Sequence, residues 1–435
     1  DAVIPAFRTI TDEVKDAGAV IIQQLYHVGA HGDSDLSFAP HWSPSGGPSY
    51  HDSDGSHAMT GAEVEELLDA HVAAAVRAKA SGFQGVEVWA AYHSLLDQFW
   101  TPWSNRREDR WGGSLENRTR FSREVIERIR RDCGEGFIIG LAVSYSEAYE
   151  VTLGAEALCE ILDLHDRTGH VDYVTVGAGS YLEFESIIPP FTHAEKLTTP
   201  LTAQLKSVLK HAVVTSEAGV RTPENGEAII ASGLADLVSI VRGQIADPHL
   251  ARKVAEGRAD DVRGCISCNQ MCWGRRSRDY WISCLINPSA GREFEWGGDR
   301  FTPAAMPKRV LVVGAGPAGL EAARVAAERG HRVEIVEALP VVGGQFRLAG
   351  MQPRRGQILE LMHWYERQFD QLGVRLRLNT FVEEQELADH AAEVVIVATG
   401  SLPDESGFQR WVPAEATLPG IEAGGVWFVS YTHLT

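Results

Sequence analysis

Through the first 250 residues, short runs of apolar and β-branched residues alternate with longer stretches of helical periodicity. This alternation is typical of a parallel sheet built from strand–helix units. Helical patterns occur at 9–19, 61–82 and 222–233. The apolar runs predict six strands, in the segments 19–27, 85–91, 137–144, 173–179, 212–219 and 235–243.

The number of strands bears on the fold class. A (β/α)8 barrel has eight strands, typically over about 250 residues. The chain opens on Asp1 rather than Met. We therefore expect an α/β protein whose residues 1–255 form strands 3–8 of a (β/α)8 barrel, with the first two strand–helix units upstream of Asp1.

A different pattern follows the expected barrel. Residues 256–300 are polar and rich in Trp, and a Pro-bearing connector then leads into a strand, a glycine turn, a helix and a second strand. This order predicts a Rossmann-like domain for FAD or NAD(P) over residues 305–435. Because the last residues close no helix or strand, we expect this domain to be incomplete at its C-terminus.

Charge and hydropathy narrow the class of protein. With 40 Lys and Arg against 59 Asp and Glu, the net charge of −19 argues against a nucleic-acid partner. No apolar run reaches the ~20 residues that span a bilayer. No basic-then-apolar signal segment opens the chain. We expect a cytoplasmic protein that contacts neither nucleic acid nor membrane.

Four of the six cysteines crowd into the segment 265–284. Their spacing is C-x2-C-x3-C-x11-C, and four thiolates in one loop hold zinc, hold an iron–sulfur cluster or form disulfides. A reducing compartment disfavours disulfides. Paired C-x2-C knuckles are more typical of zinc, so the spacing favours one [4Fe–4S] cluster and leaves zinc open. The predicted ligands are Cys265, Cys268, Cys272 and Cys284.

A glycine motif marks the start of the last domain. Gly314, Gly316 and Gly319 follow a strand directly, and Glu337 ends the next strand 23 residues after the first glycine. These glycines permit the turn, the approach of a pyrophosphate and close helix packing, while the acidic residue accepts from a ribose hydroxyl. A further glycine-bearing approach contains Gln345.

Aromatic residues crowd the end of the second expected strand, where barrel chemistry takes place. Trp89, Tyr92 and His93 lie there. Aromatic faces bind an alkylated ammonium, by ~2 kcal/mol or more when desolvated. Packing is the alternative, and we favour it for the next three tryptophans: Trp100, Trp103 and Trp111.

Three other strand ends carry candidates for a cofactor. His27 directly follows the first expected strand. It would either contact a cofactor or have its hydrogen bonds met within the fold. Arg242 ends the last one, beside Gly243, and a guanidinium there suits the phosphate of FMN. Gly219 would let backbone N–H groups approach that phosphate.

Together, several segments resemble the multidomain relatives of old yellow enzyme, which include trimethylamine dehydrogenase, 2,4-dienoyl-CoA reductase and the demethylases of dimethylglycine and N-methylproline. The segments are "QQLYHVGAHG", "DQFWTPWSNRREDRWGGSLENRTRF", "GLADLVSIVRGQIADPHLARK", "CISCNQMC" and "VLVVGAGPAGLEAA". The resemblance covers nearly the whole chain. It implies an FMN barrel, a [4Fe–4S] cluster beside it and a domain that binds FAD or ADP. It also implies that Gln24 contacts the isoalloxazine ring.

The sequence departs from this family at two places. Ala142 stands where the family usually carries an arginine near flavin N1. Trp89, Tyr92 and Ser94 stand where the ene-reductases carry a His/Asn pair and a proton-donating Tyr. Loss of that phenol disfavours reduction of unsaturated carbonyls, and aromatic rings suit a methylated amine better.

The sequence therefore predicts an FMN- and [4Fe–4S]-dependent oxidoreductase that demethylates a small N-methylated amine or amino acid. Tyr92 is the predicted substrate contact and amine base, with His93 and Trp89 beside it. Electrons would leave through the cluster to a protein acceptor or to the second nucleotide site. The alternatives are an NAD(P)H-dependent reductase of an enoyl substrate and an inactive fragment. Whether the protein forms a homo-oligomer stays open.

Overall fold

The computed structural model describes residues 2–32, 37–50 and 55–401. The chain divides into two compact units, each described here by itself. Unit 1 comprises Asp1–Pro189, His193–Val220 and Glu224–Ile240. Unit 2 comprises Pro190–Thr192, Arg221–Pro223 and Val241–Thr435.

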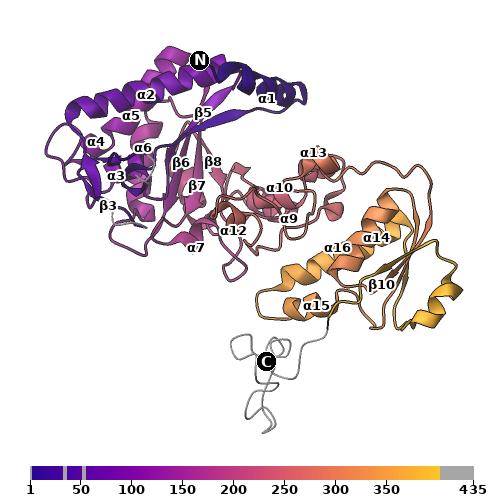
Figure 1. The fold of residues 1–435 in the computed structure, drawn as a ribbon. Coiled ribbons are helices and arrows are strands. Elements are labelled where there is room, and N and C mark those ends of the chain that lie inside the picture. The colour runs from indigo at the N-terminus through magenta and orange to yellow at the C-terminus, as the bar shows by residue number, and fades with distance from the viewer. Residues whose placement is uncertain (1, 33–36, 51–54, 402–435) are drawn as a thin grey trace, which may run out of the picture. The chain divides into compact units, whose positions relative to one another are not determined.

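Unit 1 is built on a six-stranded sheet in which every strand runs parallel to its neighbours (Figure 1). The strands pair in chain order, so each one lies next to the strand that precedes it. This confirms the six predicted strands and the α/β fold class. The strands are β1 (Ile22–Leu25), β5 (Gly85–Ala90), β6 (Ile138–Tyr145), β7 (Tyr173–Ala178), β8 (Val213–Ser216) and β9 (Leu237–Val238).

Helices connect these strands and cover the sheet. The predicted helices are present, and α2 begins with a capping box in which Thr60 and Glu63 bond each other's backbone N–H. Its buried residues recur every three or four positions and pack against α5. The longer helices are α1 (Ile4–Asp16), α2 (Gly61–Ala80), α5 (Arg120–Cys133), α6 (Ala155–Asp166), α8 (Thr199–Val208) and α9 (Pro223–Ala231).

Shorter elements carry the loops at the strand ends. The pattern of the chain did not predict the small three-stranded sheet of β2 (Trp42–Ser43), β3 (Gly47–Pro48) and β4 (Gly55–Ala58). The segment 41–58 is rich in Ser, Gly, His and Pro and contains no apolar run that would predict a strand. The short helices are α3 (Leu95–Trp100), α4 (Leu115–Arg118), α7 (Phe184–Ile187) and the 3-10 turn η1 (Gly29–His31).

The last strand of unit 1 is shorter than predicted. The predicted segment 235–243 contains only β9, because only Leu237 and Val238 pair with β8. The chain then turns helical at Val241, whose carbonyl accepts from the N–H groups of Gln244 and Ile245. Arg242 consequently begins a helix instead of ending a strand, which corrects the prediction.

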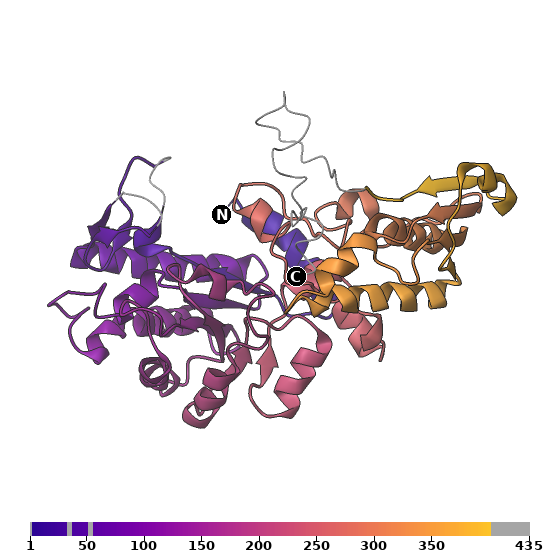
Figure 2. The ribbon, with the colours of Figure 1, turned by 90° about the horizontal axis from the view of Figure 1, so that it is seen from below.

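Unit 2 holds the Rossmann-like pattern as a four-stranded parallel sheet in the order β12-β11-β10-β13. Helices α14 and α16 contact one another and lie side by side in both views (Figures 1 and 2). The elements are β10 (Arg309–Val313), α14 (Pro317–Glu328), β11 (Arg332–Val336), α15 (Gly344–Gly350), α16 (Gly356–Leu372), β12 (Arg375–Arg377), η3 (Glu384–His390) and β13 (Val394–Val397).

The segment that precedes this sheet has little regular structure. It contains short helices separated by loops, and the cysteine loop lies in the middle of it. The helices are α10 (Arg242–Ala246), α11 (Leu250–Ala255), η2 (Ala259–Asp261), α12 (Trp273–Arg276) and α13 (Glu293–Trp296). Across the described ranges of both units, no helix combines the length and apolar character needed to cross a membrane.

Buried ion pairs tie the cysteine segment to the nucleotide domain within unit 2. Arg263 and Arg324 are 0% and 2% exposed and both bond Asp299, at 3.1 and 2.8 Å. Arg324 also pairs with Glu321 at 2.7 Å on its own helix, and Tyr365 of α16 donates to the same carboxylate. Breaking such a pair leaves an uncompensated buried charge, so the network fixes where the cysteine segment lies against α14 and α16.

Phe121 tests the packing of unit 1. Its side chain is fully buried on α5, with its ring stacked on that of Phe99 at 4.7 Å. Phe121→Ala should lower the free energy of unfolding by about 3–5 kcal/mol, because it leaves a cavity in the core. Urea denaturation measures the loss. The exposed Val76→Ala is the control and should change stability by under about 0.5 kcal/mol. A similar small loss for both variants would contradict this packing.

Candidate functional site: a barrel mouth, a cysteine loop and a nucleotide loop

Side chains at the ends of the parallel strands of unit 1 converge because carboxyl ends of such strands meet at one edge. Gln24 on β1 donates from Nε2 to Glu87 Oε1 on β5 at 2.8 Å. Thr175 on β7 donates from Oγ1 to the other oxygen of Glu87 at 2.8 Å. Trp89 lies two residues beyond Glu87 and thus on the same side of the strand. The predicted flavin contact Gln24 is therefore held by Glu87.

A continuous set of aromatic rings lies at this edge. Trp89 contacts Tyr92 at 5.4 Å and Tyr26 at 6.0 Å between ring centroids. Tyr26 shares a 2.5 Å hydrogen bond with the hydroxyl of Tyr181, which stacks on Tyr50 at 5.1 Å. We call this set the aromatic cluster; its members are Tyr26, His31, Tyr50, Trp89, Tyr92, His93 and Tyr181.

Two histidines of the aromatic cluster are hydrogen-bonded to each other. His31 Nε2 lies 2.8 Å from His93 Nδ1, and the backbone N–H of Tyr50 donates to His31 Nδ1. Burial and the neighbouring His31 lower the pKa of His93 to about 3, so it is neutral near pH 7. Because Tyr50 donates to His31 Nδ1, we assign the shared proton to His31 Nε2, which leaves His93 Nε2 with an N–H.

The backbone at the end of β5 is strained. Tyr92 and His93 have φ values of 61° and 65°, the left-handed region that side chains with a Cβ disfavour. The Ser144 hydroxyl accepts a hydrogen bond from the Tyr92 N–H at 2.7 Å, and the Asp97 carboxylate accepts one from the His93 N–H at 2.7 Å. Gln98 donates to the His93 carbonyl at 2.7 Å. The surrounding bonds therefore impose this conformation on the two predicted catalytic residues.

The protonation of Tyr92 is fixed by its surroundings. Its side chain is buried, and burial together with the charges of Glu217 and Glu87 raises its pKa well above the ordinary value. The phenol thus stays protonated near neutral pH. This supports a contact role for Tyr92 and argues against the predicted role as an amine base.

Several buried polar atoms at this edge have no hydrogen-bond partner in the part of the chain that the structure describes. They belong to two members of the aromatic cluster, to Ser94, which follows His93, and to Thr215 on β8. A bound flavin or substrate would satisfy such atoms, so their presence fits the predicted ligands. The atoms are Trp89 Nε1, His93 Nε2, Ser94 Oγ and Thr215 Oγ1.

Two other predicted residues of unit 1 have local structural partners. His27 Nδ1 accepts from the Gly29 N–H, and burial lowers the pKa of His27 to about 4. Gly219 has φ +84°, and a Cβ there would come within 2.9 Å of the Lys196 nitrogen. The tight turn explains why Gly219 is a glycine. Its predicted contact with the FMN phosphate stays a prediction, as does the role of His27.

The cysteine loop of unit 2 gathers the four predicted ligands. All four are free thiols, and they line one small pocket. Ser267 donates its backbone N–H to Cys265 Sγ at 3.4 Å. Burial raises the pKa values of Cys268 and Cys284, and hydrogen bonds from the backbone amides of Gln270 and Ile286 oppose part of this rise. Hydrogen bonds from backbone amides to sulfur stabilise thiolates and iron–sulfur clusters, so the donor set fits the predicted cluster.

The arginine predicted to bind the FMN phosphate lies beside this loop. Arg242 lines the same small pocket and donates from Nη1 to Asn269 Oδ1 at 2.5 Å, and its charge lowers the pKa of Cys265, which burial raises. Gly243 is buried, and its carbonyl accepts from the Asp247 N–H.

Within the described ranges, no three His, Cys, Asp or Glu side chains form a group that would hold a single metal ion.

The glycine turn of the nucleotide domain has the predicted form. Gly314 has φ +102°, and a Cβ on Gly319 would lie 1.9 Å from the Gly314 carbonyl oxygen. Gly316 caps α14, and a Cβ there would meet no atom within 4 Å. The first N–H groups of α14 therefore adjoin an open glycine, as a pyrophosphate requires.

The acidic residue after β11 already has backbone partners. Glu337 accepts from the N–H groups of Ala315 and Leu339 at 2.7 and 2.9 Å. One of its oxygens thus braces the glycine turn. Gln345 on α15 donates to the Ser401 carbonyl at 2.6 Å. Contacts of both side chains with a nucleotide stay predictions.

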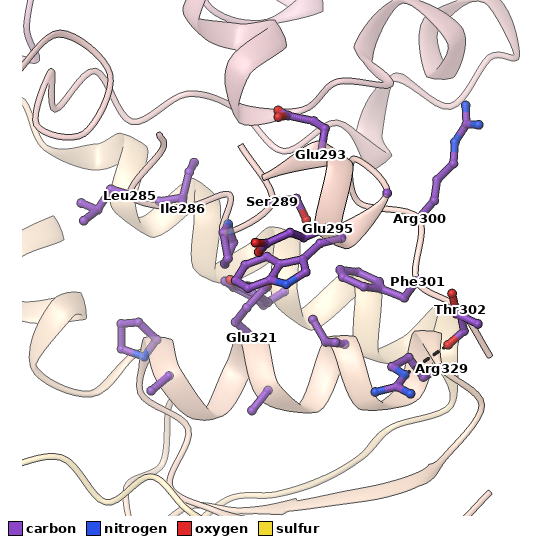
Figure 3. Close-up of a pocket in the computed structure, with 18 of the residues that line it drawn as sticks. Leu285, Ile286, Ser289, Glu293, Glu295, Arg300, Phe301, Thr302, Glu321 and Arg329 are labelled. Atoms are coloured by element: carbon purple, nitrogen blue, oxygen red, sulfur yellow. Dashed lines mark hydrogen bonds between the residues drawn. The ribbon is translucent and has the colours of Figure 1, made fainter. Parts of the chain in front are cut away.

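A separate pocket of about 1100 Å³ lies in unit 2 between α14 and the segment 285–302 (Figure 3). Figure 3 shows Glu321 of α14 and Arg329, which directly follows this helix, with Arg329 bonded to the Thr302 carbonyl at 3.1 Å. None of the predicted ligand or catalytic residues lines it. We therefore assign it no part in the chemistry described below.

Several residues of the site were missed by the sequence analysis. Some lie within predicted strand segments, where alternation along the strand was an available signal: Tyr26 two residues after Gln24, Glu87 two residues before Trp89, and Glu217 in the segment 212–219. Others lie outside the apolar runs and have no periodic signal: His31, Tyr50 and Tyr181.

The fold and these sites define an FMN-type barrel joined to a nucleotide-binding domain, which is the arrangement of a flavin-dependent oxidoreductase. Residues 1–261 match the NADH:flavin oxidoreductase / NADH oxidase family, and residues 297–409 match the pyridine nucleotide-disulphide oxidoreductases. The chain therefore belongs to the NADH:flavin oxidoreductase / NADH oxidase family. The predicted resemblance, the (β/α)8 barrel and the Rossmann-like domain are confirmed.

Individual relatives cover nearly all of the chain. The N,N-dimethylglycine/sarcosine dehydrogenase of Chromohalobacter salexigens is 35% identical over 94% of the chain and 60% of its own length. A structure of 2-naphthoyl-CoA reductase has a TM-score of 0.88 at 31% identity, over 95% of this chain and 64% of that one. Histamine dehydrogenase from Rhizobium sp. 4-9 has a TM-score of 0.87 at 28% identity, over 94% and 60%. The chain spans about 60% of the length of the curated relatives it matches.

The glycine turn gives a test of nucleotide binding. Gly319→Ala should destabilise unit 2 by about 1–3 kcal/mol, because its methyl group would overlap the Gly314 carbonyl. Gly316→Ala should leave stability within about 0.5 kcal/mol yet weaken ADP binding about tenfold or more. Urea denaturation and titration calorimetry with ADP measure the two effects. Unchanged ADP affinity in Gly316→Ala would place the nucleotide elsewhere.

Proposed function

We propose that this chain is the catalytic part of an FMN- and [4Fe–4S]-dependent dehydrogenase that demethylates a small N-methylated amine or amino acid. The observation that carries the proposal is the aromatic cluster at the end of β5. Trp89 and Tyr92 belong to it, at the positions where ene-reductases carry a carbonyl-binding pair. The dehydrogenase of N,N-dimethylglycine and sarcosine, 35% identical, is named for N-methylated substrates.

The chain's own side chains would bind and orient the amine. Rings of Trp89, Tyr26 and Tyr181 provide π faces for the alkyl groups on nitrogen. His93 is neutral and offers Nε2–H as a donor, and Tyr92 keeps its phenolic proton. Neutral, hydrogen-bonding walls of this kind suit an amine that reacts in its uncharged form.

FMN would be held by Gln24, by the turn at Gly219 and by Arg242. A bound FMN would supply a hydride acceptor for the N-methyl carbon, and water would then hydrolyse the oxidised amine to formaldehyde and the demethylated amine. Cys265 and its three partner cysteines would hold the cluster, which carries electrons one at a time. The glycine turn at Gly316 would hold the adenine nucleotide of FAD or ADP.

A reductase running in the opposite direction is the second candidate. The 2-naphthoyl-CoA reductase structure matches 95% of this chain, and a pyridine nucleotide-disulphide oxidoreductase domain follows the barrel. In that case NAD(P)H would supply electrons to an enoyl substrate. Ser94 stands in place of the phenolic proton donor, which disfavours this chemistry.

Anaerobic visible spectra of the holoenzyme distinguish the two functions. Dimethylglycine or another N-methyl amine, added alone, should bleach the flavin band near-stoichiometrically and release formaldehyde. NADH alone should leave the band in place. Bleaching by NADH alone, with no effect of any N-methyl amine, would instead establish the reductase.

The cysteine loop makes an independent prediction. Cys268→Ala should reduce iron and acid-labile sulfide from about four each per chain to below about one, since one cluster ligand is lost. Cys159→Ala is the matched control, because Cys159 is a buried free thiol on α6 in unit 1. Elemental analysis and sulfide assay give the result. Zinc instead of iron in the parent protein would contradict the proposed cluster.

A further inference from the structure

Two glutamates of unit 1 belong to the strands of the parallel sheet or follow them directly. Glu87 on β5 receives hydrogen bonds from β1 and β7, through Gln24 and Thr175. Glu217 directly follows β8, and its backbone is fixed there because its N–H donates to Val176 and its carbonyl accepts from Thr198. Thr215 of β8 pairs with Thr175 of β7, and Glu217 lies two residues after Thr215, so its side chain lies on the same face of the sheet as those of Thr175 and Glu87.

Glu217 is half-buried, and its carboxylate makes no hydrogen bond within the described part of the chain, unlike that of Glu87. Desolvation and the negative charge of Glu87 raise the pKa of Glu217 to about 7. Glu217 therefore exchanges a proton with solvent close to neutral pH.

The strand positions beside this pair hold uncharged residues. In the pairing of the strands, Glu87 stands opposite Gly140 of β6 and Trp89 stands opposite Ala142. None of these strand positions in the described residues holds a lysine or arginine; Lys196, on the segment packed against the 217–219 turn, donates its backbone N–H to Gly219. The groups that face it are Gln24 from β1, Trp89 and Tyr92 from β5, Ala142 from β6, Tyr173 and Thr175 from β7, Thr215 from β8 and Tyr181 from the loop after β7.

We propose that Glu217, together with Glu87, takes up a proton from solvent when the flavin site is reduced and releases it when the electrons leave. The proposal rests on the proposed function only in that FMN binds at these strand ends, where Gln24 is held by Glu87. It assigns a proton-coupling role to Glu217, which the sequence analysis did not single out.

Hydride transfer would bring two electrons and one proton from the substrate carbon, so the site would gain one negative charge. A guanidinium would offset that charge by ion pairing, but β6 has Ala142 at the neighbouring position. The added charge would raise the proton affinity of the carboxylate pair, which would bind one proton from water. When the two electrons leave, the proton that came with the hydride and the proton on the carboxylate pair would both return to solvent.

The midpoint potential of the bound flavin against pH tests this proposal. Between pH 6 and 8, the slope in the parent holoenzyme should be up to about twice that of Glu217→Gln, because one further proton accompanies each electron pair. Glu87→Gln should move the steep region to lower pH, since loss of the Glu87 charge lowers the pKa of Glu217. Spectroelectrochemical titration measures all three proteins without any substrate, so failure of the amine chemistry is a separate result.

Two control variants locate the effect. Glu147→Gln removes an exposed acid beyond the end of β6 and should keep the parent slope. Asp97→Asn removes the other buried acid of this region, whose pKa burial raises to about 7 and which bonds the backbone of His93. It should also keep the parent slope. Parent-like slopes in both Glu217→Gln and Glu87→Gln, or a reduced slope in Asp97→Asn alone, would overturn the proposal.

Discussion

Parallel pairing of six strands in chain order is the constraint on which the chemistry of unit 1 depends. It brings the carboxyl ends of all six strands to one edge, so residues far apart in sequence meet there. Glu87, Gln24 and Thr175 are the direct example, since two hydrogen bonds join three strands through one carboxylate. A shift of one residue in the pairing of β5 would turn Glu87 and Trp89 to the opposite face of the sheet.

Strand ends could be predicted from the sequence because buried parallel strands are continuous apolar runs. Trp89 and Tyr92 were singled out for that reason, whereas Gln24 was implied by the family resemblance and the glycine turn at Gly316 by its motif. Residues brought in by loops could not be found. Tyr181 reaches the site because its N–H bonds the Tyr92 carbonyl, a contact between residues 89 positions apart that leaves no local pattern.

The same limit explains the misplaced end of the last strand. The apolar run through 235–243 suggested a strand up to Arg242, but only two residues pair with β8 before the chain turns into α10. A hydrophobic run records burial and does not record which backbone groups find partners. As a result, Arg242 lies next to Asn269 of the cysteine loop, an arrangement that strand periodicity alone does not specify.

Burial acts on the ionisable groups of both units, but the groups that oppose it differ. In unit 2, burial raises the pKa values of Cys265 and Cys284, while arginines and backbone amides act in the opposite direction and favour the thiolate form that binds iron. In unit 1, burial keeps His93 neutral and Tyr92 protonated, so the aromatic cluster offers donors and π faces without a net charge. Negative charge gathers instead on Glu87 and Glu217, beside the predicted flavin contact. A reaction that delivers electrons to this side then needs a proton, and a carboxyl group destabilised by burial is suited to accept it.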